Sequence, residues 1–323
     1  MKKFFIGLLV SCIFIWFSIK GVEYEEIIYE LKEAKYIYLI PTVILFLGLT
    51  FLRSIRWGVI LSPIEKISQK RLLPISCVGY MAIVLIPMRI GEFVRPYLVS
   101  RKNNISMSSG LATIFVERVL DSLTLLFMLL VVIISSQLPE WVVRTGYSFL
   151  LTFIFIVSFM FFLYYKTELT IRLLRPLLSI FPQKVIKKIE SLIRTFVEGF
   201  QIISNPTELI VTIFLSILVW TLSALAIYCL FHFQNFQLPL MSTFVVLVIT
   251  IIGVSLPAAP GFLGNFQFGC IMALSIFGIH KSDAFTFSMI YYFFGIGINI
   301  LLGLVCLPLI DNFYDDFMKT IKR

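Results

Sequence analysis

Charged residues are scarce in this chain. They make up 14% of its 323 residues, whereas hydrophobic residues make up 59%. A soluble domain usually has an apolar share nearer half. The shortage of charge therefore excludes a soluble fold, and we expect an all-α polytopic membrane protein.

Histidine is also scarce, and the cysteines show no pattern. The chain has two histidines, His232 and His280, and its five cysteines lie within apolar runs without the spacing of metal ligands. We therefore expect no metal site, no disulfide framework and no histidine-based catalysis. A glycine-rich phosphate loop ending in Lys-Ser or Lys-Thr is absent as well, so we expect no cofactor and no ATP-driven step in this chain.

The formal net charge is +9, which in a soluble protein would suggest a nucleic-acid partner. Here most Lys and Arg residues fall in segments on one predicted side of the membrane, as positive-inside topology requires. We therefore expect no nucleic-acid partner. We expect a multi-pass protein of the cell (inner or cytoplasmic) membrane, with both termini cytoplasmic.

Six apolar runs approach or exceed the roughly 20 residues that a membrane helix needs. Two further runs are shorter and end in charged or backbone-breaking residues, so each is expected to enter and leave the membrane from one face. The expected spans are 4–19, 36–61, 106–135, 147–165, 207–231 and 284–310, and the expected re-entrant hairpins begin with 72–87 and 241–256.

The two short runs break in the same way, because a proline is followed by a glycine four positions later in each. Broken hydrophobic segments in corresponding places of two halves are typical of transporters with inverted repeats. We interpret the chain as one membrane domain with repeat units at about 36–136 and 206–306. The expected hairpin-breaking residues are Pro87, Gly91, Pro257, Pro260, Gly261 and Gly264.

Three charged residues, Glu117, Arg118 and Asp121, lie inside the run 106–135. The uncharged stretch after them is too short to cross the hydrocarbon core, so these charges should lie below the membrane surface. Glu117 and Asp121 share a helix face at i and i+4. Charges at such depth indicate a functional site, and the alternative is a structural ion pair between Arg118 and a carboxylate.

The first break carries Arg89, Glu92 and Arg95, which share one face if a helix re-forms after Gly91. Two guanidiniums at a hairpin tip suit a phosphate, because each offers a planar fork of donors. The alternative is that they mark the cytoplasmic surface. Arg53 and Arg56 are more readily explained as the inner end of the span 36–61 than as phosphate ligands.

The second break carries amides in place of charges, Asn265 and Gln267. Irregular backbone at membrane depth is tolerated where it is buried or lines a cavity. The two amides could bind a head group or satisfy backbone groups that the break leaves unpaired.

The segment 166–206 contains apolar residues at helical spacing with Lys and Arg on the opposite face. This pattern predicts a cytoplasmic amphipathic helix. Two positions stay open for it, on an anionic leaflet or against the cytoplasmic end of the bundle.

Four motifs in order resemble the lysylphosphatidylglycerol synthase transmembrane region family, also called flippase-like integral membrane proteins. We expect a standalone member without the aminoacyl-transferase domain, so synthesis of lysylphosphatidylglycerol is not expected. The motifs are Arg53-x-x-Arg56-Trp57, Pro87-x-Arg89-x-Gly91-Glu92-x-x-Arg95, Glu117-Arg118-x-x-Asp121 and Pro257-x-x-Pro260-Gly261-x-x-Gly264-x-Phe266-Gln267.

The resemblance implies a lipid flippase, or a transporter of a lipid-linked precursor, that works by alternating access and has no catalytic residue. Two alternatives are an intramembrane enzyme that modifies lipid head groups and a scaffold for a glycosyltransferase. The expected partners are membrane lipids with a phosphate-bearing head group; a lipid-biosynthesis enzyme and a second copy of the chain stay open. The expected substrate-binding residues are Arg89, Glu92, Arg95, Glu117, Arg118, Asp121, Asn265 and Gln267.

Overall fold

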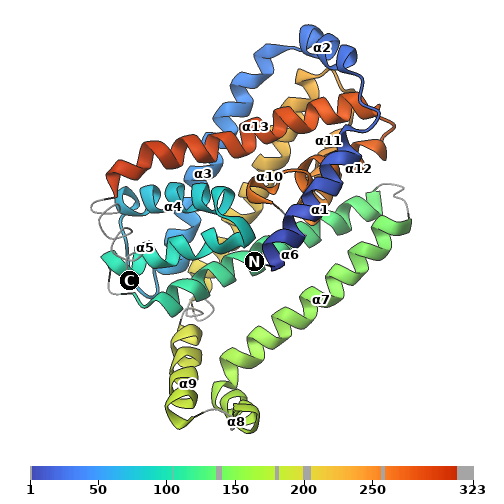
Figure 1. Cartoon of the computed structure of the whole chain (residues 1–323). Coiled ribbons are helices and arrows are strands. Elements are labelled where there is room, and N and C mark those ends of the chain that lie inside the picture. Colours follow the sequence, from blue (N-terminus) through green and yellow to red (C-terminus); the bar gives the residue numbers. More distant parts are fainter. Residues whose placement is uncertain are drawn as a thin grey trace. The chain divides into compact units, whose positions relative to one another are not determined.

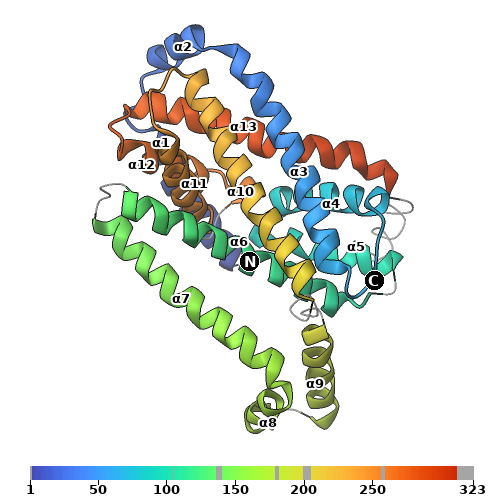
Figure 2. The ribbon, with the colours of Figure 1, turned by 180° about the vertical axis from the view of Figure 1, so that it is seen from behind.

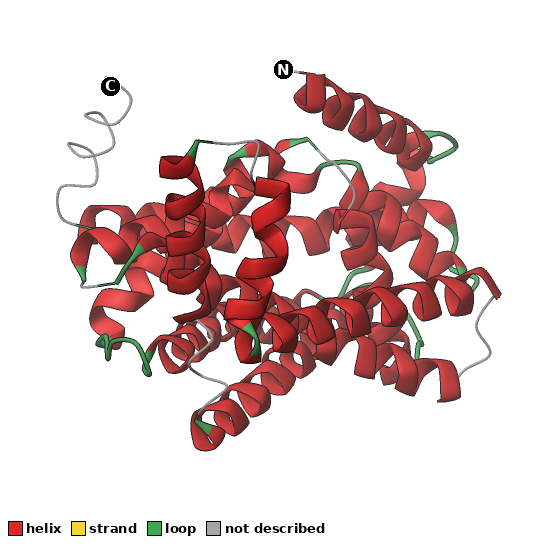
Figure 3. Cartoon of the chain, turned by 90° about the horizontal axis from the view of Figure 1, so that it is seen from below, coloured by secondary structure: helices red, strands yellow, loops and turns green. Residues whose placement is uncertain are grey.

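The computed structural model describes residues 2–103, 105–135, 140–178, 182–198, 205–255 and 259–310. Every regular element in these ranges is a helix (Figure 3). The expected all-α membrane fold is therefore confirmed.

The helices group into two compact units, each assembled from separate stretches of sequence. Unit 1 holds the described parts of 1–53, 70–94 and 219–323, and unit 2 holds the described parts of 54–69 and 95–218. These boundaries differ from those of the repeat units 36–136 and 206–306, and the inverted repeat stays a prediction.

Among the described elements, six α-helices and four short 3-10 helices belong to unit 1, apart from Gln69 at the start of α4. Helices α3 (Leu39–Leu61) and α10 (Pro206–Phe233) contribute residues to both units. The elements within unit 1 are α1 (Lys2–Ile19), α2 (Tyr24–Glu33), η1 (Tyr36–Tyr38), α4 (Gln69–Leu85), η2 (Pro87–Phe93), α11 (Leu240–Ser255), η4 (Pro260–Phe262), α12 (Asn265–Ser275), α13 (Lys281–Cys306) and η5 (Leu307–Leu309).

Helices α11 and α12 form a tight hairpin, with α1 beside α12 (Figure 2). A Cβ on Gly253 would lie 2.9 Å from the carbonyl oxygen of Asn265, and one on Gly269 would lie 3.0 Å from the Cα of Thr250. Small residues let helix backbones touch in a membrane, where there is no water to drive association. The hairpin is therefore held by direct backbone packing; its re-entry from the outer face stays a prediction.

Unit 2 is built around α6 (Met107–Ser135), which packs on α7 (Glu140–Tyr165) and α9 (Gln183–Glu198). The other helices of this unit are α5 (Val94–Lys102), most of which belongs to it, and α8 (Thr167–Leu178), which follows α7 (Figure 1). Helix α9 also packs on α8, and the position of the amphipathic segment at the membrane stays a prediction. The core of this unit contains Ile60, Ala112, Val116, Val119 and Leu120.

Within the part of the chain that the structure describes, three helices are long and apolar enough to cross a membrane. They are Tyr36–Leu61, which contains α3, Pro206–Phe233, which is α10, and Lys281–Leu309, which is α13 with its extension. The helices α1, α6 and α7 coincide with the other expected spans, and shorter apolar helices cover Val10–Ile19, Leu150–Phe159 and Leu240–Ser255. The count of six full spans stays a prediction.

Candidate functional site

Two carboxylates of α6 lie inside unit 2. Glu117 has none of its surface exposed, and Asp121 has 6% exposed. Helix α6 begins after Ser106, whose hydroxyl accepts a hydrogen bond from the backbone N–H of Ser109 at 3.0 Å and so caps the first turn. From that start, the α-helical register brings the two carboxylates to one face, one turn apart.

Arg95, in the first turn of α5, binds Glu117 at two points. Its Nη1 donates to Oε1 at 3.2 Å, and its Nη2 donates to Oε2 at 3.0 Å. The guanidinium also lies 4.2 Å from the centre of the Trp57 ring, and that ring is fixed because its Nε1 donates to the Thr113 hydroxyl at 3.1 Å. A planar cation between a carboxylate and an aromatic face is a geometry that arginine can adopt and lysine cannot.

Arg56, on α3, joins both carboxylates to α10. Its Nη1 donates to Oδ1 of Asp121 at 2.6 Å and to the Ser216 hydroxyl at 3.0 Å, while its Nη2 donates to Oδ2 of Asp121 at 3.3 Å. The same Nη2 lies 3.2 Å from Oε1 of Glu117. Arg56 is 1% exposed, so the guanidinium of this bridge is withdrawn from solvent.

Arg118 completes the network at its edge. Its Nη2 lies 2.8 Å from Oε1 of Glu117 and 3.5 Å from Oδ2 of Asp121, and its side chain is 43% exposed. Within the described residues the network therefore holds three guanidiniums and two carboxylates, an excess of one positive charge. An anion can approach that excess at Arg118, because this guanidinium is the most exposed of the three.

The interruption between α4 and α5 differs in detail from the expectation. A 3-10 helix runs through Pro87–Phe93, and the α-helix restarts at Val94, later than expected. The backbone of Gly91 packs on α4 so closely that a Cβ would overlap the carbonyl oxygen of Ala82. Glu92 is half-buried in unit 1, and the side chains of Pro87 and Arg89 lie outside the described part of the structure.

The second break depends on glycine conformation. Gly261 and Gly264 have φ of 73° and 85°, in the left-handed region that glycine enters without strain. Pro260 opens the short helix η4 between α11 and α12, and Pro257 lies outside the described residues. The chain can therefore reverse between two helices that stay in backbone contact.

The two amides after this break bind protein groups. Asn265 donates from Nδ2 to the carbonyl oxygen of Gly253 at 3.2 Å, and Gln267 accepts at Oε1 from the N–H of Gly264 at 2.8 Å. The Ser11 hydroxyl of α1 accepts from the N–H of Ala259 at 2.7 Å and donates to Asn265 Oδ1 at 3.3 Å. These bonds satisfy the broken backbone, and a role for either amide in binding a head group stays a prediction.

The family described as the lysylphosphatidylglycerol synthase TM region matches residues 4–303. The chain belongs to this family. The resemblance inferred from the four motifs is thereby confirmed, and so is the assignment as a multi-pass membrane protein.

Three archaeal relatives of this family member are described as UPF0104 membrane proteins. One from Methanocaldococcus jannaschii is 24% identical over 233 residues, which cover 71% of this chain and 93% of the relative. One from Methanothermobacter thermautotrophicus is 24% identical over 301 residues, covering 88% of each chain. A second M. jannaschii protein is 25% identical over 335 residues, covering 98% and 97%. The similarity to the second and third relatives extends along most of the chain.

Sequence reasoning named Trp57 only as part of a family motif, predicted no role for Thr113 or Ser216, and ranked Arg56 low. Arg56 lies within the apolar run 36–61, and a charge inside such a run needs a partner within the protein. That position was the available signal. The partners of Arg56 lie in segments far apart in sequence. Helical periodicity does not indicate which of these segments pack together.

A second group of ligand-type side chains lies where α2 meets the start of α13. Glu26, His280 and Asp283 place one potential metal-ligand atom each within 4.8 Å of one another. Nδ1 of His280 lies 3.1 Å from Oε2 of Glu26, so this contact accounts for much of the grouping without an ion. The three side chains are partly exposed, and we assign no metal to them.

Proposed function

We propose that this chain moves a phosphate-bearing lipid, or a lipid-linked precursor, between the leaflets of the cell membrane. The observation that carries the proposal is the network of Arg56, Arg95, Glu117, Arg118 and Asp121. A desolvated ion network costs free energy unless it is fully paired, and inside a membrane such networks usually serve transport. Among the described residues it holds one more guanidinium than carboxylates, and the exposed guanidinium of Arg118 is suited to a phosphate.

The first contact of the phosphate is assigned to Arg118. A phosphate offers a guanidinium the same bidentate geometry as a carboxylate, so it competes with Glu117 and Asp121 for this residue. Displacement of Arg118 would leave the two carboxylates with two arginines and bring the charge of the remaining network to zero. The sequence-based assignment of Arg89 and Arg95 as phosphate ligands remains a prediction. In the described arrangement Arg95 binds Glu117, so a phosphate would have to compete with this carboxylate for it.

The carboxylates supply the second half of the proposed cycle. When a phosphate draws Arg118 away, Glu117 and Asp121 gain acceptor capacity for a proton or for a cationic part of the head group. Alternating access between two repeat units would then expose the loaded site to the other leaflet. We propose transport over catalysis because both carboxylates are already occupied by guanidiniums, which makes each a poor general base.

Topology forms part of the same proposal. We place both termini and the α8–α9 segment on the cytoplasmic side, because Lys and Arg are concentrated in these parts of the sequence. Membrane lipids are the proposed partners.

Transport is tested with two sets of proteoliposomes, containing phosphatidylglycerol or phosphatidylethanolamine with a fluorophore on one acyl chain, which an impermeant reductant bleaches only in the outer leaflet. The wild type should expose inner-leaflet lipid faster than empty liposomes do, and Arg118→Gln should slow this at least about tenfold, as expected for one charge-assisted contact. Arg118→Lys should fall between the two, since lysine keeps the charge without the planar fork.

Arg144→Gln is the matched control, because Arg144 is an exposed arginine of α7 in the same unit, paired with Glu140. It should transport at the wild-type rate. A wild type no faster than empty liposomes would refute the transport proposal. A normal rate in Arg118→Gln would refute the assignment of the phosphate contact.

A further inference from the structure

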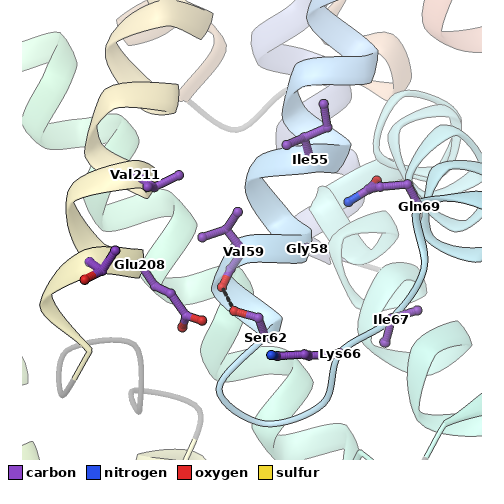
Figure 4. A pocket seen from close by; sticks show the side chains of 10 residues that line it. Ile55, Gly58, Val59, Ser62, Lys66, Ile67, Gln69, Glu208 and Val211 are labelled. Carbon is purple, nitrogen blue, oxygen red and sulfur yellow. Dashed lines mark hydrogen bonds between the residues drawn. The ribbon is translucent and has the colours of Figure 1, made fainter.

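Unit 2 contains a cavity of about 360 Å³ that the charged network does not use. It lies between the last turns of α3, the loop that leads to α4, and the first turns of α10 (Figure 4). This volume is at the low end of the range for small-ligand sites. It suits a small lipid head group better than a whole lipid or a large glycosylated head group.

The walls of the cavity are amphipathic. One part is apolar, and the other carries hydroxyl, amide and charged groups. The apolar lining comes from Ile55, Val59, Ile67 and Val211, and the polar lining from Ser62, Lys66, Gln69, Thr207 and Glu208. An amphiphile can therefore place its polar end at the charged side while its hydrocarbon part follows the apolar wall.

Two opposite charges face this space from different elements. Lys66 extends from the α3–α4 loop and Glu208 from the first turn of α10, and Figure 4 shows their charged ends directed toward the same opening. Oε2 of Glu208 is buried and accepts no hydrogen bond from the residues that the structure describes. Within those residues neither side chain forms an ion pair.

A buried carboxylate oxygen without a donor is unfavourable, and a ligand that supplies an N–H removes the penalty. The positive charge of Lys66 attracts an anion to the same cavity. The cavity is therefore complementary to a molecule that carries a phosphate and a primary ammonium group close together.

We propose that this cavity binds the head group of a zwitterionic phospholipid with a primary ammonium, its phosphate at Lys66 and its ammonium at Glu208. This inference rests on the proposed lipid transport for its biological role, because the cavity would select the lipid that the charged network moves. The recognition itself depends only on the lining residues.

The test measures binding of short-chain lipids to the full-length protein in detergent by calorimetry. Dihexanoyl phosphatidylethanolamine supplies phosphate and ammonium, dihexanoyl phosphatidylglycerol supplies phosphate without a cation, and dihexanoyl phosphatidylcholine supplies a cation without N–H donors. The wild type should bind the ethanolamine lipid about tenfold more tightly than either other lipid, the effect of one charge-assisted hydrogen bond.

The variants separate the two contacts. Glu208→Gln keeps the shape of the side chain and should abolish the preference for the ethanolamine lipid, while Lys66→Gln should weaken binding of all three lipids by similar factors. Lys187→Gln and Glu140→Gln change exposed charges of the same unit and should change neither affinity nor preference.

The outcome is separable from that of the transport test. Equal binding of the three lipids by the wild type, or an unchanged preference in Glu208→Gln, would overturn this inference even if Arg118→Gln abolished transport. A preference that Glu208→Gln removes would uphold the inference even if the wild type moved no lipid, and the transport proposal alone would then fail.

Discussion

Arg95 and Glu117 form a two-point ion pair in which the side chains are 1% and 0% exposed. The pair joins the first turn of α5 to the middle of α6, and Trp57 covers the guanidinium. Both ends of the pair are therefore withdrawn from solvent, and each charge depends on the other for its stability.

Removing one partner of this pair should destabilise the protein strongly. Glu117→Gln keeps the shape of the side chain but leaves Arg95 with a neutral acceptor, and we expect the free energy of unfolding to fall by about 3 kcal/mol. The measurement is unfolding by sodium dodecyl sulfate in mixed micelles, followed by circular dichroism.

The double variant Arg95→Met/Glu117→Met should lose less than the sum of its two single variants, because no uncompensated charge of the pair remains. Glu140→Gln, which breaks the exposed pair with Arg144, should stay within about 0.5 kcal/mol of wild type. Additive losses at positions 95 and 117 would show that the pair is not energetically coupled.

Any side chain at position 91 should lower the stability of the fold. A methyl group there would overlap the carbonyl oxygen of Ala82, and backbone cannot rotate away as a flexible side chain can. We expect Gly91→Ala to lower the thermal unfolding midpoint by several degrees, corresponding to roughly 1–3 kcal/mol. Gly297 has open space around its Cα, so Gly297→Ala should leave the midpoint unchanged or raise it slightly through better helix propensity. Equal effects of the two substitutions would contradict the close contact.

Ser11 should stabilise the interruption between α11 and α12. Its hydroxyl accepts from the N–H of Ala259 and donates to Asn265, and Ser11→Ala would leave this N–H without its acceptor. The expected loss is about 1–3 kcal/mol. Ser148→Ala provides the comparison, because the exposed Ser148 hydroxyl donates within its own helix and its removal should cost little. Hydrogen exchange at Ala259 should rise in the first variant and not in the second.

Glu30 should make stability depend on pH. Burial, together with the negative charges of Asp283, Glu26 and Glu33, raises the pKa of the Glu30 carboxyl. The folded chain holds this proton more tightly than the unfolded chain does, so the stabilising contribution is present below the ordinary pKa of 4.5 and is lost as pH rises through the raised pKa.

Glu30→Gln should therefore raise the unfolding midpoint at pH 7 by about 1–2 °C and have no effect near pH 4. Glu25→Gln, at an exposed position of the same helix, should shift the midpoint less at pH 7. A Glu30→Gln effect that is the same at both pH values would show that the charge of Glu30 is not its cause.

Local sequence patterns predicted the all-α membrane fold and the shared face of Glu117 and Asp121, because spacing within one helix fixes which residues lie together. They also predicted ion pairing of Arg118 as an alternative to function. The pairing of these carboxylates with Arg56 and Arg95 was not predictable in the same way. It depends on which distant helices pack together, and a single sequence gives no direct measure of that.

Gly91 shows a second limit. Its presence in a chain break suggested a need for backbone freedom, yet the contact with Ala82 requires the absence of a Cβ for reasons of space. At Gly261 and Gly264 the conformational reason holds, since both have positive φ. A glycine in a sequence indicates one of these two causes, and only the surrounding structure distinguishes them.

The contact between α11 and α12 also bears on how the chain reaches the membrane. Helix α11 has 16 residues, about 24 Å at 1.5 Å per residue, and a hydrocarbon core is about 30 Å thick. Alone it would leave polar backbone at its broken end within lipid. We expect the two helices to leave the translocon as a preformed pair, with Gly253 and Gly269 already in contact, so the order of synthesis favours their assembly before α13 follows.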